Sequence, residues 1–396
     1  MRVPVEAYPM LAAVETHLPH LTRAQRDGLV WWVYGAVLGN NACQAAVVTA
    51  LEPLVGPDGT EALRRRLRAW GYAGADKDVP GRAEVDAAAC FAPLLGWVLA
   101  WWHGDALPLA VDATALGDRL VVVAVSVLYR DTAIPVAWHV AAAGRPGAWL
   151  APLLDLLAVL APAVPPTQTV VVLADRGLWS PRLWEAIRSH GWHPLLRIQQ
   201  AALFRPRGGK TGKAAALVPG PGHAWVGRGT AFKDAPKRKD ATLVAVWEVG
   251  QDQPCLALTD LAPDDVGPCW YGLRAWIELG FRTLKSGGWH WERIRRTDPD
   301  RVARHWLVLA VATLWAVATG TRVEDAERLG VAPANLRVAV PPPPADGPRA
   351  ASVFARGLAR LRWQLLRVRR LWTRIWLWPD AWPAAPPDLQ VVVGPT

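Results

Sequence analysis

The strongest constraint on the fold is a succession of short apolar runs, rich in β-branched residues, between positions 106 and 175. Each run is bounded by polar turn residues, as expected of neighbouring strands in a buried sheet. Stretches at 148–160 and 181–190 have helical spacing instead, and Pro181 suits the first turn of the second helix. This alternation predicts a mixed α/β core. The predicted strands are Pro108–Asp112, Arg119–Ser126, Thr132–Trp138 and Thr169–Asp175.

The segments on either side of this core differ in composition. Leu21–Trp102 has helical spacing, with interruptions at Gly56–Pro57 and near Val79–Gly81. Arg197–Pro254 is rich in Gly, Pro and basic residues and predicts a β-rich insertion with a basic surface. Helices are expected again from Trp270 and over 300–319.

The C-terminal part is unusually basic. After a stiff break at Pro341–Pro344, the segment Phe354–Trp378 contains seven arginines, five aromatic residues and no acid. Such a segment can bind DNA, a partner chain or a membrane surface. A shorter basic segment, Glu61–Trp70, either contacts DNA phosphate or forms a solvated helix face.

The overall charge favours a polyanionic partner. The chain has 44 Lys and Arg against 34 Asp and Glu, a formal net charge of +10. Guanidinium groups bind phosphate through planar, bidentate contacts, so this excess of mainly arginine points to nucleic acid.

Other site and location classes find no support in the sequence. The four cysteines are far apart and lack zinc-ligand spacing, so neither a structural zinc nor a disulfide framework is expected. Met1–Leu18 lacks the apolar core of a secretory signal, which predicts an intracellular protein. The most apolar stretches, Ala87–Trp102 and Trp306–Gly320, are too short to span a membrane and are expected to be buried helices.

Two acids at strand ends suggest a metal site. Asp112 and Asp175 each close a predicted apolar strand, where a carboxylate is costly unless it meets a cation or a hydrogen-bond donor. Either acid alone is explained as an ordinary turn residue. Asp118, Asp131 and Asp155 are alternatives to these two acids, although Asp118 lies in an expected hairpin turn between strands.

A later segment, Tyr271–Lys285, places a third acid among cations. On a helix at about 100° per residue, Tyr271, Arg274, Glu278 and Lys285 share one narrow stripe. The opposite face can pack on a sheet and consists of Leu273, Ile277, Gly280, Phe281 and Leu284. The alternative is a solvated face on which Arg274 and Glu278 pair at i,i+4.

Together these residues resemble the bacterial DDE transposases of the insertion-sequence-four type, which includes the Tn-five and Tn-ten enzymes. The resemblance rests on the order Asp112, Asp175, Glu278, on the Tyr-x2-Arg-x3-Glu-x6-Lys pattern that ends at Lys285, and on Leu173–Gly177. It covers roughly residues 106 to 322. It implies an RNase H-like, retroviral-integrase-like catalytic core with a β-rich insertion, preceded by an N-terminal helical domain.

A chain of 396 residues is long enough for two or three structural units. With the resemblance, the expected division is an N-terminal helical, DNA-binding domain at 1–105, core segments at 106–197 and 256–330, the basic insertion at 198–255 between them, and a Pro-rich break with an Arg/Trp-rich tail at 331–396.

The resemblance implies cut-and-paste DNA transposition. Asp112, Asp175 and Glu278 would be catalytic and would hold two Mg2+ ions, or Mn2+ in their place, about 3.5 to 4 Å apart. Tyr271, Arg274 and Lys285 would bind DNA phosphates near the cleaved bond. The partners would be double-stranded DNA, as transposon ends and target, and a second copy in a homodimeric DNA complex. The expected location is the bacterial cytoplasm, at the nucleoid, with no membrane contact.

Members of this type often proceed through a DNA hairpin with a flipped base stacked on an aromatic side chain. Trp225 and Trp247 are the first candidates here, although a core position is the favoured explanation for either one. Arg176, beside the second Asp, would meet a phosphate or pair with an acid.

Rival functions remain. An RNase H-like nuclease without strand transfer needs the same acids, and an inactive transposase derivative would still bind DNA. An ATPase is disfavoured because Gly209–Thr211 lacks the upstream glycine of a phosphate loop, with Phe204 at that position. No G-x-S-x-G turn supports a serine hydrolase.

Overall fold

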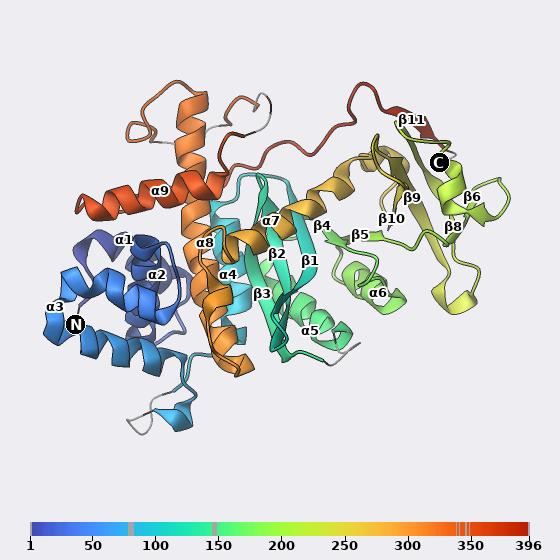
Figure 1. Ribbon diagram of the computed structural model, residues 1–396. Helices are drawn as coiled ribbons and strands as arrows, with labels where there is room; N and C mark the ends of the chain where they lie inside the picture. The colour runs from blue at the N-terminus through green and yellow to red at the C-terminus, as the bar shows by residue number, and fades with distance from the viewer. Residues whose placement is uncertain are drawn as a thin grey trace.

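The computed structural model describes residues 2–77, 83–144, 149–337, 339, 341–344, 347 and 349–394. In this part of the chain the strands form one mixed sheet, ordered β3-β2-β1-β4-β5-β10-β9-β8-β6-β7, with β11 also paired to β8 (Figure 1). The strands are β1 (Ala106–Leu116), β2 (Leu120–Tyr129), β3 (Thr132–Ala142), β4 (Thr169–Ala174), β5 (His193–Arg197), β6 (Leu203–Pro206), β7 (Gly212–Lys213), β8 (His223–Ala231), β9 (Lys239–Trp247), β10 (Cys255–Thr259) and β11 (Gln390–Val393).

The first five strands confirm the expected mixed α/β core. β1, β2 and β3 form an antiparallel meander, whereas β1, β4 and β5 run parallel to one another. The first three strands are longer than predicted because they continue past the apolar runs, and Asp112 lies within β1 instead of at its end. β4 ends at Ala174, directly before Asp175.

The strands of the expected insertion continue the same sheet. β10 pairs antiparallel with β5, and β9 and β8 follow it. The chain returns to β5 through β10, so the segment between β5 and β10 extends the sheet outward from its parallel edge (Figure 1).

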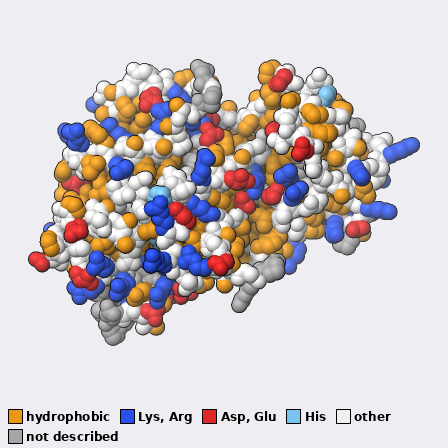
Figure 2. All heavy atoms as spheres, viewed as in Figure 1, with side chains coloured by type: hydrophobic (Ala, Val, Ile, Leu, Met, Phe, Trp, Pro, Cys, Tyr) orange, Lys and Arg blue, Asp and Glu red, His pale blue; other side chains and the backbone are white. Residues whose placement is uncertain are grey.

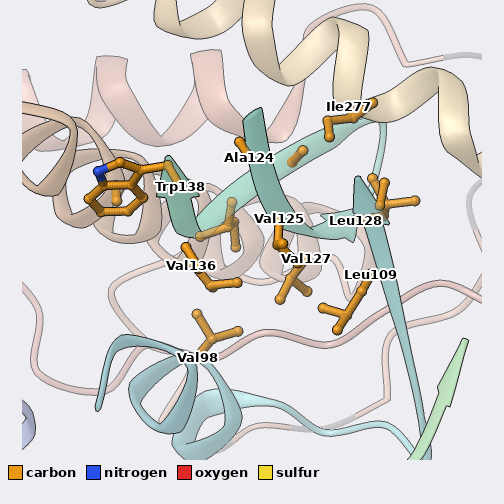
Figure 3. Close-up of a cluster of buried hydrophobic side chains, with 14 of the residues drawn as sticks. Val98, Leu109, Ala124, Val125, Val127, Leu128, Val136, Trp138 and Ile277 are labelled. Carbon is orange, nitrogen blue, oxygen red and sulfur yellow. The ribbon is translucent and has the colours of Figure 1, made fainter. Parts of the chain in front are cut away.

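Helices cover both faces of the meander. Val98 of α4 (Phe91–Trp101) and Ile277 of α7 (Ala275–Leu284) approach the strands from opposite sides (Figure 3). Gly280 allows α7 to lie close to β3, because a Cβ at this position would be 2.7 Å from Cβ of Ala133. The expected apolar face of this segment is buried, at Leu273, Ile277, Gly280, Phe281 and Leu284.

The expected helices on either side of β4 are also present. α5 is Leu150–Leu160 and α6 is Pro181–Ser189, while the beginning of the stretch predicted at 148–160 lies outside the described residues. In α6, Ser180 accepts a hydrogen bond from the backbone of Leu183 and Pro181 occupies the first turn. This is the arrangement that favours a helix start.

The N-terminal region is helical, as expected. It contains α1 (Tyr8–His17), α2 (Arg23–Gly39) and α3 (Gln44–Gly71), which precede α4. Gly56 adopts a φ of 70° and interrupts α3 at the predicted position. The interruption predicted near Val79–Gly81 lies outside the described residues.

A long buried helix, α8 (Pro299–Arg328), runs through the centre of the protein. Its length and composition would allow it to cross a membrane, yet 94% of its most apolar window is buried inside the protein. A helix that is apolar on all sides is commonly the core of a large globular protein. The prediction of a buried helix at 306–320 is therefore confirmed.

The C-terminal segment is part of the fold. α9 (Val353–Leu366) crosses α8 so closely that a Cβ on Gly357 would lie 1.7 Å from the carbonyl oxygen of Ala316. The chain then runs past Trp102, where Leu377 forms an isolated β-bridge with Trp102. It continues to β11 on the far part of the sheet (Figure 1). The residues expected to form a tail therefore connect the helical region with the strands of the insertion.

Candidate active site

Strand register brings the two aspartates together. In the parallel pair of β1 and β4, Val111 lies opposite Ala174. Asp112 and Asp175 are the next residues on these neighbouring strands and therefore share one edge of the pairing. Their side chains are 19% and 33% exposed. The sequence interpretation, which placed both acids at strand ends, is thus supported for β4 and changed for β1, which continues along β2.

Arg274 connects the first aspartate to the glutamate. One terminal nitrogen of Arg274 lies 2.8 Å from Oδ2 of Asp112, and the other donates to Oε1 of Glu278. Arg274 is 14% exposed, whereas Glu278 is 62% exposed. The three side chains form a cluster that is anchored in the sheet and open to solvent at Glu278.

The acids influence one another electrostatically. Burial raises the pKa of Asp112, and the guanidinium of Arg274 and the backbone N–H of Ala113 oppose this shift. The negative charges of Glu278 and Asp175 raise the pKa of Asp112 further. Where neighbouring negative charges raise the pKa of a carboxyl group, a nearby positive charge stabilises its ionised form.

Tyr271 and Arg197 complete the cluster around the second aspartate. The hydroxyl of Tyr271 donates to the carbonyl oxygen of Ala174 at 3.3 Å, beside Asp175. Arg197, the last residue of β5, approaches Oδ1 of Asp175 at 3.5 Å. Burial raises the pKa of Tyr271, so its hydroxyl remains a proton donor.

Arg197 was not singled out from the sequence. The sequence did hold a signal for this residue, because Arg197 ends the apolar run that follows Asp175. If two such strands are parallel neighbours, the residues at their ends lie at the same edge of the sheet. It also borders a cavity of about 210 Å3 between β9, β10 and the segment of Tyr271 and Arg274, lined in part by Glu248 and Cys255.

The α-helix predicted over Tyr271–Lys285 is wrong in its first turn, whereas its last residue, Lys285, is the C-cap of α7. Trp270–Arg274 is a 3-10 helix, η8, and α7 begins only at Ala275. The tighter turn directs Tyr271 toward β4. At the other end the chain leaves the helix at Lys285, because Gly287 and Gly288 turn back onto the last carbonyls of α7.

Lys285 therefore does not join the acids. Burial lowers its pKa and the charge of Glu292 opposes that shift, while none of the three acids contributes to it. Of the predicted stripe, Tyr271, Arg274 and Glu278 surround Asp112 and Asp175, and Lys285 lies beyond the end of α7.

The substitute acids lie elsewhere. Asp118 is in the turn between β1 and β2, as expected. Asp131 pairs with Arg349 at 2.6 Å, and Asp155 lies on α5, where its charge acts on His139. None of them is among the charges that shift the pKa of Asp112.

The two tryptophan candidates have structural roles. Trp225 is 6% exposed and packs edge to face with Phe204. Trp247 is half-buried, and its indole N–H donates to the carbonyl of Gln251 at 2.8 Å. Arg176 is exposed in the turn after Asp175.

The donor set suits a hard divalent cation, although the arrangement holds an arginine. Carboxylate oxygens are the ligands that Mg2+ prefers. Within the described ranges no group of three or more His, Cys, Asp or Glu side chains is spaced to hold a metal ion. The guanidinium of Arg274 instead supplies positive charge between Asp112 and Glu278. The residue types therefore suit a cation, but in this arrangement the guanidinium of Arg274 takes the place between Asp112 and Glu278.

A comparison with models of protein families gives a match for part of the chain. Residues 145–315 match the family model of a transposase DDE domain. The match covers less than half of the chain; it includes Asp175 and Glu278 and begins after Asp112. No curated protein matches the sequence. The match supports a DDE transposase domain here, and such a domain implies transposase activity, a nuclease function on DNA.

Proposed function

We propose that this protein is a DNA transposase of the insertion-sequence-four type, in which Asp112, Asp175 and Glu278 catalyse cleavage at element ends and strand transfer into target DNA. The observation that carries the proposal is the cluster around Arg274, which links Asp112 to Glu278 beside Asp175. These acids come from three distant parts of the sequence, and two of them lie in the segment that matches a transposase DDE domain.

The proposed core is RNase H-like. The order β3-β2-β1-β4-β5, antiparallel at one side and parallel at the other, supports it, with α5 and α6 beside the parallel strands. In this proposal the segment between β5 and β10 is the β-rich insertion, and the helices before β1 form the N-terminal DNA-binding domain.

The three carboxylates would hold divalent metal, two Mg2+ ions or Mn2+ in their place. The chemistry that metal held by these residues would supply is activation of the attacking hydroxyl and stabilisation of the leaving oxygen of the phosphodiester. Asp112 contributes a partly buried carboxylate whose charge is disfavoured by burial and by its acidic neighbours. In the free protein, the contact with Arg274 offsets the free-energy cost of burying the charge of Asp112.

Positive charge around the acids would bind the DNA backbone. If another cation neutralised the acids, Arg274 would be free to donate two parallel hydrogen bonds to the oxygens of a phosphate. Tyr271 keeps its proton and offers a hydroxyl donor beside Asp175. Lys285, at the other end of α7, would contact a phosphate farther along the strand.

The test is cleavage of duplex DNA that carries the flanking sequences of the gene's own locus. We expect nicking in Mg2+, none in EDTA, and at least about a thousand-fold loss with Glu278→Gln, since each metal-binding acid is needed in the transition state. Asp155→Asn is the matched control, because Asp155 is an exposed acid on α5 and should be dispensable.

The products decide between the proposal and its rivals. Cleaved ends joined to a second duplex indicate a transposase, and the protein on such ends should sediment as a dimer. Cleavage without joining would instead identify a nuclease. Binding without cleavage in Mg2+ would identify an inactive derivative, and full activity of Glu278→Gln would remove this residue from the site.

A further inference from the structure

The end of α9 and the segment after it form a surface of arginines without acidic partners. It consists of Arg360, Arg362, Arg367, Arg369, Arg370 and Arg374, called here the α9 arginine surface. Among the described residues none of the six has a carboxylate within ion-pair distance, whereas Arg356, one turn earlier, pairs with Glu327. The apolar side of α9 is buried, including Leu358, Leu361 and Leu365.

One of these guanidinium groups is held in place by two indole rings. The central carbon of Arg360 lies 4.4 Å from the ring centroid of Trp363 and 4.5 Å from that of Trp372. Its Nε is enclosed without a hydrogen-bond partner in the described structure. Stacking fixes the plane of a guanidinium, which reduces the entropy lost when it binds a planar or bidentate acceptor.

A second arginine adds uncompensated charge beneath this group. Arg322 of α8 also stacks on Trp372, at 4.2 Å, and donates to the carbonyl oxygens of Pro333 and Arg374. Burial and the charges of Arg360 and Arg374 lower its pKa to about 10. Two guanidinium groups share one ring here, and neither pairs with a carboxylate of the described part of the chain.

The turn after α9 is held by backbone hydrogen bonds and carries exposed arginines. Val368 adopts a φ of 52°, which is strained for a β-branched residue. The turn is nevertheless fixed, because the backbone N–H of Arg369 donates to Gln364 and that of Leu371 to Glu6, at 2.8 and 3.0 Å. The side chains of Arg367, Arg369 and Arg370 are exposed on either side of it.

This surface is separate from the candidate active site. Its turn contacts the N-terminal segment at Glu6, and α9 lies over α2, whereas Asp112 and Asp175 lie on β1 and directly after β4 (Figure 1). Figure 2 shows lysine and arginine side chains over the N-terminal helices and the part where α9 lies.

We propose that the α9 arginine surface binds the phosphate backbone of duplex DNA at a second site, away from the bond that is cut. The inference rests on the proposed function, since a transposase must hold DNA beyond the cleaved position. An anionic membrane is the less favoured ligand, because the apolar face of α9 is used against α8. Among the described residues of this surface, the large hydrophobic side chains that are exposed are Trp363, Leu366 and Val368, at 45%, 69% and 73%.

The test is binding of the full-length protein to a random-sequence duplex of about 30 base pairs, long enough for roughly three helical turns. Fluorescence anisotropy across a KCl series gives the affinity and its salt dependence. For R369A/R370A we expect the slope of log K against log salt to become shallower by about 1 to 2, because each lost phosphate contact contributes about 0.9. An unchanged slope would overturn the proposal.

Three controls make the result specific. R182A/R188A removes two exposed arginines of α6 and should leave the slope unchanged. R369K/R370K preserves the charge and should restore most of the slope, which separates charge loss from misfolding. Loss of binding to phosphatidylserine vesicles in R369A/R370A, with an unchanged DNA slope, would assign the surface to membranes and overturn the proposal.

The result is independent of cleavage. The same titration with Glu278→Gln should give the wild-type slope, because Glu278 is not part of the α9 arginine surface. A normal cleavage assay with an unchanged R369A/R370A slope would reject this inference alone. An altered slope without cleavage by the wild type would support the surface and reject the transposase proposal.

Discussion

Two clusters of arginine and carboxylate side chains use the same chemistry in opposite surroundings. In the closed cluster, Arg130 lies 2.7 Å from Asp325 and both side chains are 0% exposed. In the open cluster, Arg274 lies 2.8 Å from Asp112, and its other partner, Glu278, is 62% exposed. The ion-pair distances are nearly equal, so burial is the difference between them.

The closed cluster connects distant segments of the chain. Arg130 follows β2, Asp325 lies near the end of α8, and Asp380 in the C-terminal segment approaches Arg130 at 3.4 Å. Trp376 also donates to Asp325 at 2.9 Å. Because its carboxylates pair with Arg130 and Trp376 inside the protein, this cluster fixes the path of the C-terminal segment. The open cluster keeps charge within reach of solvent, as a binding site requires.

The largest expected effect is on stability, from Arg130→Ala. It leaves Asp325 buried without its main cation, and breaking such a buried pair costs about 3 to 5 kcal/mol. Urea unfolding followed by circular dichroism measures this. Glu278→Gln is the matched control, since its exposed i,i+4 pair is worth only a few tenths of a kcal/mol. Equal losses of unfolding free energy in both variants would contradict the difference that we infer between the two clusters.

The next effect uses metal to distinguish the clusters. If the open cluster holds divalent cations, Mg2+ at about 100 times its Kd should raise the free energy of unfolding by about 2.7 kcal/mol. Asp112→Asn should lose this increment because it removes a charged oxygen ligand. Asp380→Asn, in the closed cluster, should retain it. An Mg2+ effect of equal size in wild type and Asp112→Asn would show that the metal acts elsewhere.

The smallest effect is a pH dependence of the closed cluster. Although burial opposes it, the charges of Arg130 and Arg349 lower the pKa of Asp380 from its ordinary value of 3.8. A lowered pKa adds stability above pH 3.8 that is lost as the pH falls through the folded value. We expect Asp380→Asn to cost about 1 to 3 kcal/mol near pH 7.

The same comparison repeated at low pH tests the direction of the pKa shift of Asp380. Once Asp380 is protonated in both the folded and the unfolded wild type, the variant and the wild type should differ little. The measurement is urea unfolding of both proteins between pH 7 and about pH 2.5. A difference that grows as the pH falls would contradict the assigned shift.

The elements that could be predicted are those with a local signal. The apolar runs identified β1 to β4, and the acids at their predicted ends singled out Asp112 and Asp175 as candidate metal ligands. Glu278 was predicted from a helical stripe that is only partly helical. α7 presents Glu278 on the predicted face, whereas Lys285 is the residue at which the helix ends, before two glycines that turn the chain.

The parts that could not be predicted depend on pairing between distant segments. Arg197 reaches Asp175 only because β5 lies beside β4. The C-terminal segment was interpreted as a tail, since its arginines and prolines show no strand pattern. Its docking depends on the contact of Gly357 with α8 and on β11 pairing with β8, and neither partner is visible in the local sequence.

The sequence by itself determined which residues are available for chemistry and on which strands and helix they lie. Side-chain periodicity and charge are local properties, and they set the acids, the basic character and the buried helices. Only the tertiary structure decided which arginine neutralises which acid, because burial and distance depend on how segments far apart in the chain pack. For that physical reason the ion pair of Arg130 is buried, whereas the ion pairs of Arg274 are open to solvent.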